Sequence, residues 1–200
     1  MPKLLSIFVF LGLSACQPIA QTEKVAGHTM GTTYTVKAQT KMLDQQAIER
    51  RLSQINQIFS SWDQNSELSV LNRQAINQPI ELSDEMAFVL TQALSLHEQT
   101  KGFFSPTMGT LIDLWGFGVN PVERHPEQLM IEQALAKSAI QQLTLSGSQF
   151  EKKADIQLNL SAIAKGYAVD EISKLLKNQN IEHFMVEIGG EIKTQGGWSV

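Results

Sequence analysis

Apolar side chains recur at helical spacing in two stretches of the N-terminal half of the chain. The first stretch follows Asp44 and the second follows Ser83; both are typical N-cap residues, because their side-chain oxygens accept from free N–H groups of a first helical turn. The apolar positions are Ile48, Leu52, Ile55 and Phe59 in the first stretch, and Met86, Val89, Leu90, Ala93 and Leu94 in the second. The spacing predicts two amphipathic helices, the second ended by Gly102.

Two further helices are predicted in the C-terminal half. Pro126 suits the first turn of one of them, and its apolar positions are Leu129, Ile131 and Leu135. The other follows a predicted buried strand at 155–160 and a turn of small residues, and its apolar positions are Ala168, Ile172, Leu175 and Leu176.

Strand patterns lie between these helices. From Thr32 to Lys37 apolar and polar residues alternate, so that Tyr34 and Val36 share one face. Further strands are predicted at 141–146, 183–188 and 190–195, with Gly189-Gly190 bending the last pair. Helices and hairpin-like strands are interspersed without a regular βαβ order, which predicts an α+β fold with a mostly antiparallel sheet.

The turn that follows the predicted strand at 155–160 holds a single lysine, Lys165, among small residues. Backbone N–H groups at a helix start, with an ammonium beside them, suit a phosphate-bearing ligand. Small residues also serve ordinary strand-to-helix turns, so the pattern alone leaves both interpretations open.

The first sixteen residues have the pattern of a bacterial lipoprotein signal peptide. Lys3 is followed by a ten-residue, largely apolar run at 4–13, which spans about 15 Å as a helix and is too short for a bilayer core of about 30 Å. Leu-Ser-Ala before Cys16, the only cysteine, resembles a lipobox, in which the thiol is acylated. A buried N-terminal helix is the alternative. Residues 17–26 are then expected to be a polar tether, and the protein to be extracytoplasmic and lipid-anchored.

Charge and histidine spacing exclude two other classes of site. The net charge of −4 and the lack of a basic run argue against a nucleic-acid partner. The four histidines are scattered without the spacing of zinc ligands. Asp170 and Glu187 are local carboxylates that we expect to cap or pair within the scaffold and not to bind a metal.

Five blocks of the chain occur in an order that is typical of one family. They are GHTMGTTY at 27–34, FSSWDQNSELSVLN at 59–72, GFFSPTMG with LWGFG at 102–109 and 114–118, NLSAIAKGYAVD at 159–170, and VEIGGE at 186–191. Together they resemble the ApbE family, the FAD:protein FMN transferases, and they cover nearly everything after residue 26. The resemblance implies one ApbE-like FAD-binding domain over 27–200. Family members continue for roughly half as much again, so we expect a C-terminally truncated fragment.

The resemblance also implies a reaction. A threonine of an acceptor protein would attack the FMN phosphate of FAD, with magnesium (Mg²⁺) as cofactor, and AMP would leave. The implied acceptors are extracytoplasmic domains of redox complexes, such as Na⁺-translocating NADH:quinone reductase. Two alternatives stay open: an FAD-binding lipoprotein without chemistry, and a Mg²⁺-dependent hydrolase that splits FAD into FMN and AMP. A structural lipoprotein without a ligand would require all five blocks to be accidental.

Individual positions carry the implied contacts. The family's FAD contacts fall on Met30, Trp62, Phe103, Phe104, Ser105, Asn159 and Lys165. One Mg²⁺ ligand falls on Ala162, which offers its backbone carbonyl; the acidic ligands and a histidine implicated in catalysis would lie beyond residue 200. Met30 and Trp62 could instead be ordinary packing residues. Ser105 and Asn159 replace the Asp that is usual at both positions, and either change could alter nucleotide affinity.

Overall fold

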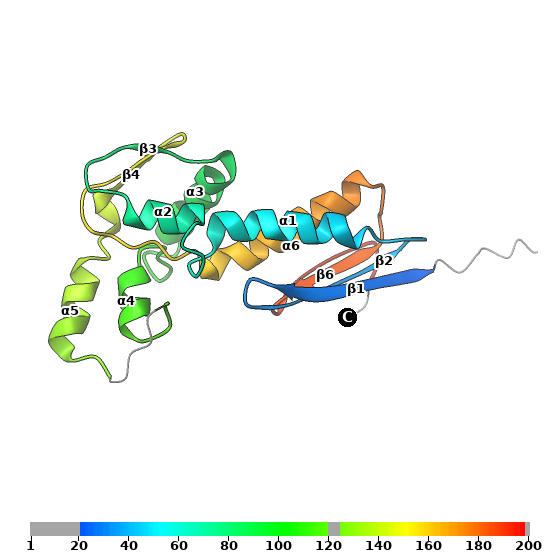
Figure 1. The fold of residues 1–200 in the computed structure, drawn as a ribbon, viewed down its shortest axis with the longest axis horizontal. Helices are drawn as coiled ribbons and strands as arrows, with labels where there is room; N and C mark the ends of the chain where they lie inside the picture. The colour runs from blue at the N-terminus through cyan, green and yellow to red at the C-terminus, as the bar shows by residue number, and fades with distance from the viewer. Residues whose placement is uncertain (1–20, 120–124, 199–200) are drawn as a thin grey trace, which may run out of the picture.

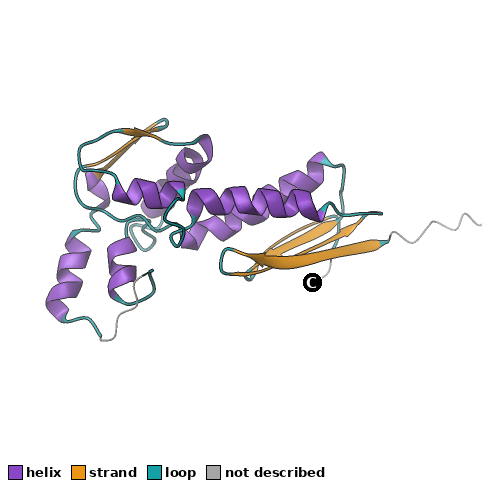
Figure 2. Cartoon of the chain, in the orientation of Figure 1, coloured by secondary structure: helices purple, strands orange, loops and turns teal. Residues whose placement is uncertain are grey.

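The structure is a computed structural model that describes residues 21–119 and 125–198. The predicted signal peptide and Cys16 lie outside the described residues. Two antiparallel sheets and six α-helices make up the described part, and Figure 2 shows how the two kinds of element are distributed. The expected α+β class with antiparallel sheet is confirmed. Within the described ranges, no helix has the length and apolar character that a membrane span requires.

The larger sheet has four strands in the order β1 (Thr22–Thr29), β2 (Thr32–Gln39), β6 (Phe184–Ile188) and β7 (Glu191–Gln195). Its inner face is covered by the two long helices α1 (Gln45–Phe59) and α6 (Ser161–Asn178), which run side by side (Figure 1). As predicted, Tyr34 and Val36 share the buried face of β2. They pair across to Ile188 and Val186 of β6, so both strands contribute to one core.

The N-capping predictions hold for the first two helices. Asp44 Oδ1 accepts from the Ala47 N–H of α1 at 2.9 Å, and all four residues of the predicted stripe are buried. Ser83 Oγ accepts from the Met86 N–H of α3 (Asp84–Gln99) at 3.2 Å. Each cap satisfies an N–H that the helix itself leaves free, which fixes where the helix begins.

A smaller sheet lies at the other end of the long helices. Its strand order is β3 (Ile80–Glu81), β5 (Gln149–Lys152) and β4 (Leu143–Ser146), and a short 3₁₀ turn (Ile140–Gln142) precedes β4. The helix α2 (Glu67–Arg73) lies beside it in Figure 1. The helices α4 (Gly109–Leu114) and α5 (Gln128–Ala136) form a separate protrusion.

Three sequence-based predictions need correction. Residues 22–26 belong to strand β1 and not to a tether, because they pair with β2 from Thr22↔Gln39 onward. Helix α5 begins at Gln128, and its predicted apolar stripe does not face a core: Leu129 is 62% and Leu135 49% exposed. Helix α5 packs against the short α4, so only Ala134 is buried.

The third correction concerns residues 155–160, which are extended but belong to neither sheet. Their backbone groups bond to the side chain of Asn72 and to the turn at 106–109 instead of to a neighbouring strand. Ile156, Leu158 and Leu160 are buried as predicted, so the burial pattern of a strand is present without its ladder. The buried positions of this segment therefore do not show which groups its backbone N–H and C=O groups bond to.

Candidate functional site

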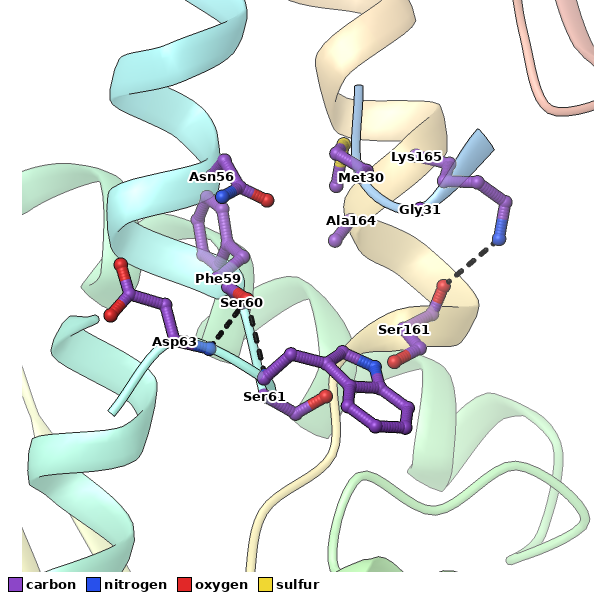
Figure 3. A pocket seen from close by; sticks show the side chains of 11 residues that line it. Met30, Gly31, Asn56, Phe59, Ser60, Ser61, Asp63, Ser161, Ala164 and Lys165 are labelled. Carbon is purple, nitrogen blue, oxygen red and sulfur yellow. Dashed lines mark hydrogen bonds between the residues drawn. The ribbon is translucent and has the colours of Figure 1, made fainter. Parts of the chain in front are cut away.

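A hollow of about 470 Å³ opens where the β1–β2 turn, the end of α1 and the start of α6 meet. Figure 3 shows the side chains that face it. Its lining consists of Met30, Gly31, Asn56, Phe59, Ser60, Ser61, Trp62, Asp63, Ser161, Ala164 and Lys165. All of them except Asn56 come from three of the five sequence blocks, and we call this hollow the main hollow.

The β1–β2 turn places Met30 at the main hollow in an unusual backbone conformation. Met30 has φ +49° and Gly31 φ +74°, and a two-residue hairpin turn with both central φ angles positive is the type I′ pattern. Glycine adopts this region freely, whereas a residue with a long side chain is disfavoured there by about 1 kcal/mol. Such strain collects at functional sites and so supports a binding role for Met30, whose side chain also packs against the hydrophobic core.

Replacing Met30 by asparagine is expected to raise the free energy of unfolding by about 1 kcal/mol, because Asn-Gly is a preferred type I′ sequence. Urea unfolding of the whole protein measures this change. Met42→Asn, at a position that is 76% exposed and has no positive φ, is the control and should change little. A loss of stability in Met30→Asn would show that Met30 packing outweighs its backbone strain.

The loop after α1 holds Trp62 over the main hollow. Ser60 Oγ accepts from the backbone N–H groups of Trp62 at 3.1 Å and Asp63 at 3.0 Å. The Ser66 hydroxyl in turn donates to the Ser60 carbonyl at 2.5 Å. These bonds fix the loop while the Trp62 side chain stays 66% exposed, so Trp62 is not a packing residue in this structure. An exposed, backbone-fixed indole offers a flat surface to a planar ligand.

The start of α6 supplies the polar side of the main hollow. Asn159 Oδ1 accepts from the Ser161 N–H at 3.0 Å, and Ser161, Ala164 and Lys165 then face the hollow at helical spacing. Among the described residues, no carboxylate lies within ion-pair distance of Lys165 Nζ, which donates to the Ser161 carbonyl at 3.4 Å. Asp63 is the one acidic residue in the lining.

The β6–β7 turn supports the Lys165 stem. A Cβ at Gly189, which has φ +56°, would lie 3.1 Å from Lys165 Cδ and 2.8 Å from Thr32 Cγ2. A side chain at 189 would therefore displace the lysine or the start of β2. The positive φ and this close approach together favour glycine at position 189.

A second hollow of about 580 Å³ adjoins the first and shares Ser61 and Trp62 with it. Asn159, Arg73 and Asp113 line it, so it is more polar than the main hollow. Burial raises the pKa of the Asp113 carboxyl above its ordinary value. Together the two hollows offer a flat apolar surface, polar side chains and an ammonium, and they share Ser61 and Trp62.

The structure thus brings together four of the seven predicted FAD-contacting residues. Met30, Trp62 and Lys165 line the main hollow, and Asn159 lines the adjoining one. Phe103, Phe104 and Ser105 line neither. Phe103 is 97% exposed, and Phe104 packs against the core. Ser105 Oγ hydrogen-bonds Thr107 Oγ1 at 2.8 Å. Their contact with FAD stays a prediction from the resemblance.

The predicted metal ligand Ala162 lies on another face of α6, in a hollow that Tyr167, Asp170 and Glu191 also line. Across residues 21–119 and 125–198 no group of three His, Cys, Asp or Glu side chains is arranged to hold a metal ion. Asp170 pairs with Lys193 at 2.5 Å, and Glu187 Oε1 accepts from the Gly190 N–H at 2.8 Å. Both carboxylates cap or pair as expected. The described residues alone therefore do not form a magnesium site.

Sequence reasoning missed several lining residues, among them Asn56, Ser60, Ser61, Asp63 and Ser161. Asn56 lies on α1 next to the buried stripe, so the helical period alone marks it as a flank position. Ser60 and Ser61 are part of a quoted block, but only their position after the last buried residue of α1, Phe59, could have indicated a loop site.

Comparison with known proteins gives a consistent result. A family model described as the ApbE family matches residues 30–200. The FAD:protein FMN transferase of Vibrio cholerae is 35% identical over 205 residues, which are 96% of this chain and 60% of that protein. The chain therefore spans about 60% of the length of this curated relative.

Solved structures match as well. The structure of the flavin transferase ApbE from Vibrio cholerae superposes with a TM-score of 0.84 at 34% identity, covering 88% of this chain and 60% of that one. The apo flavinyl transferase ApbE of Pseudomonas stutzeri gives 0.83 at 30% identity, covering 88% and 62%.

Proposed function

This chain belongs to the ApbE family, and from that membership we propose that the whole protein is an FAD:protein FMN transferase. The observation that carries the proposal is the main hollow, which Trp62 and Met30 line together with Lys165 and the start of α6. FAD has a flat isoalloxazine joined through a pyrophosphate to adenosine. The hollow offers surfaces for the first two parts side by side.

In the proposed reaction, the hydroxyl oxygen of an acceptor threonine attacks the phosphorus of the FMN half. The phosphoanhydride bond to the AMP half breaks, and a phosphoester between FMN and the threonine forms. AMP leaves with the electron pair of the broken bond, and the hydroxyl proton passes to solvent or to a base. Catalysis of such transfers consists mainly of positioning and charge neutralisation. In this chain Lys165 would bind phosphate oxygens, while Trp62 orients the ring.

We further propose that the transfer depends on magnesium. A bound Mg²⁺ would neutralise charge on the pyrophosphate, a role that its oxygen-ligand chemistry supports. The Ala162 carbonyl is proposed as a ligand from the family resemblance alone, because Ala162 borders the hollow on the other face of α6 and not the main hollow. The acceptors are proposed to be extracytoplasmic domains of flavin-bearing redox complexes, and a lipid anchor at Cys16 would hold the enzyme beside them.

The test is the mass of a candidate acceptor domain after incubation with the whole protein and FAD, with and without EDTA. We expect a gain of one FMN residue that EDTA abolishes, together with release of AMP. Free FMN and AMP with an unlabelled acceptor would show the hydrolase instead. FAD that is bound and unchanged would show the carrier, and either result would overturn the transferase for that acceptor.

A further inference from the structure

Lys152, at the end of β5, is a buried cation without an acidic partner among the described residues. Its side chain is 2% exposed, and Nζ donates to the backbone carbonyl of Asn72 at 2.6 Å and to that of Ile156 at 3.5 Å. Burial lowers the pKa of this ammonium. A buried charge that bonds only to carbonyl groups is costly, so its retention requires a reason.

The side chain of Asn72, the residue that Lys152 contacts, makes hydrogen bonds to Leu158 of the kind that a neighbouring strand would make. Its Oδ1 accepts from the Leu158 N–H at 2.7 Å, and its Nδ2 donates to the Leu158 carbonyl at 2.9 Å. One side chain thus satisfies both backbone groups of a residue in the extended segment 155–160. The Asn72 carbonyl accepts from Gln157 Nε2 at 3.2 Å as well as from Lys152, so the asparagine is held from both ends.

The segment held by Asn72 leads directly into the site. The Asn159 N–H donates to the Pro106 carbonyl at 2.8 Å, and Asn159 Oδ1 accepts from the Ser161 N–H that opens α6. Ser161 and Lys165 face the main hollow. Hydrogen bonds therefore link buried Lys152 to Asn72 and Asn72 to Leu158, and the backbone continues from Leu158 to Asn159, whose side chain bonds the first turn of α6.

We propose that Asn72 and Lys152 are positioning residues for the flavin site, which hold Asn159 and the first turn of α6 in the geometry that binds the FAD pyrophosphate. The identity of the ligand in this inference rests on the proposed function, whereas the positioning of α6 by Asn72 and Lys152 does not. Asn72 also lines the adjoining hollow, but the role proposed here is indirect for both residues: Asn72 acts through the backbone of Leu158, and Lys152 acts through the carbonyl of Asn72.

Two variants of the whole protein test the proposal. Asn72→Asp keeps the acceptor for the Leu158 N–H and removes the donor to its carbonyl, and Lys152→Met removes the ammonium at similar volume. The matched control is Lys153→Met, an exposed neighbour whose side chain makes no ion pair or hydrogen bond among the described residues. FAD affinity from flavin fluorescence, at a temperature well below each melting point, is expected to fall about tenfold in both variants and to stay unchanged in the control.

Amide hydrogen exchange separates positioning from general stability and does not require FAD to bind. In Asn72→Asp the N–H groups of Ser161 to Lys165 are expected to exchange faster, while those of strand β6 keep their protection. Equal loss of protection in both regions, or a lower melting point with unchanged FAD affinity, would overturn the positioning role. Faster local exchange in a protein that binds no FAD would leave the positioning role standing and would contradict the proposed function. If Lys152→Met does not fold, Lys152→Arg replaces it and is expected to give a smaller change of the same kind.

Discussion

Replacing Arg51 by methionine is expected to lower the free energy of unfolding by about 3 kcal/mol at neutral pH. Arg51 Nη2 lies 2.6 Å from Glu85 Oε2 and 2.7 Å from Glu171 Oε2, so one guanidinium joins α1 to both α3 and α6. The three side chains are 15–32% exposed, which gives their interaction less solvent screening than a surface pair has. Without Arg51, Glu171 would keep only Lys174 as a partner among the described residues, and Glu85 only the Tyr167 hydroxyl.

The loss should depend on pH. Burial by itself would raise the pKa of Glu85, but hydrogen bonds from Arg51 and Tyr167 outweigh burial and lower it. The pKa of Glu171 is lowered in the same way, against burial, by Lys174 and Arg51. A carboxyl whose folded-state pKa is lowered stabilises the fold above its unfolded-state pKa and loses that contribution as the pH falls through the folded-state value.

Urea unfolding at pH 7 and at about pH 3 measures this dependence, and the difference between wild type and Arg51→Met should be smaller at the acid pH. Arg50→Met is the matched control, because Arg50 is an exposed neighbour without an ion pair among the described residues. An equal loss at both pH values would assign the effect to packing of the arginine stem and not to its charge.

Replacing Trp62 by alanine is expected to weaken FAD binding to the whole protein by roughly 30-fold, within the 1–3 kcal/mol that stacking of a base on an aromatic ring contributes. Stability should change little, because the Trp62 side chain is 66% exposed and its loop is fixed through Ser60. Fluorescence titration with FAD measures the affinity, and thermal unfolding measures the stability.

Two further variants sharpen the Trp62 test. Trp62→Phe keeps a flat ring and should recover most of the affinity. Trp115→Ala removes an indole that is 45% exposed and lines neither hollow, and it should leave FAD binding unchanged. Unchanged affinity in Trp62→Ala would remove the stacking role of Trp62 and weaken the assignment of the main hollow as the flavin site.

The fold was predictable where local chemistry and burial agree. The caps Asp44 and Ser83 and their apolar stripes predicted α1 and α3, because both signals lie within a few residues of each other. The segment 155–160 could not be resolved in this way, since its partner is the side chain of Asn72, far away in the sequence. The predicted buried stripe of α5 was wrong because α5 packs against the short α4, and periodicity does not reveal which surface a helix packs against.

The candidate site was predictable only in part. Met30 and Trp62 were named through the resemblance, Lys165 also through the small residues around it, and the structure places all three around one hollow. The residues were otherwise ambiguous: an exposed tryptophan and a buried one look the same in a sequence. The backbone strain at Met30 gives no sequence signal, since it arises from the pairing of β1 with β2.

The first seven residues of α6 separate two hollows. Ser161, Ala164 and Lys165 face the main hollow, whereas Ala162, Ile163, Gly166 and Tyr167 face the hollow on the other side. An ordinary amphipathic helix restricts about every third or fourth position and leaves the others free. Here each consecutive residue from 161 to 167 borders one hollow or the other. Any substitution between 161 and 167 would therefore alter the lining of one hollow or the other.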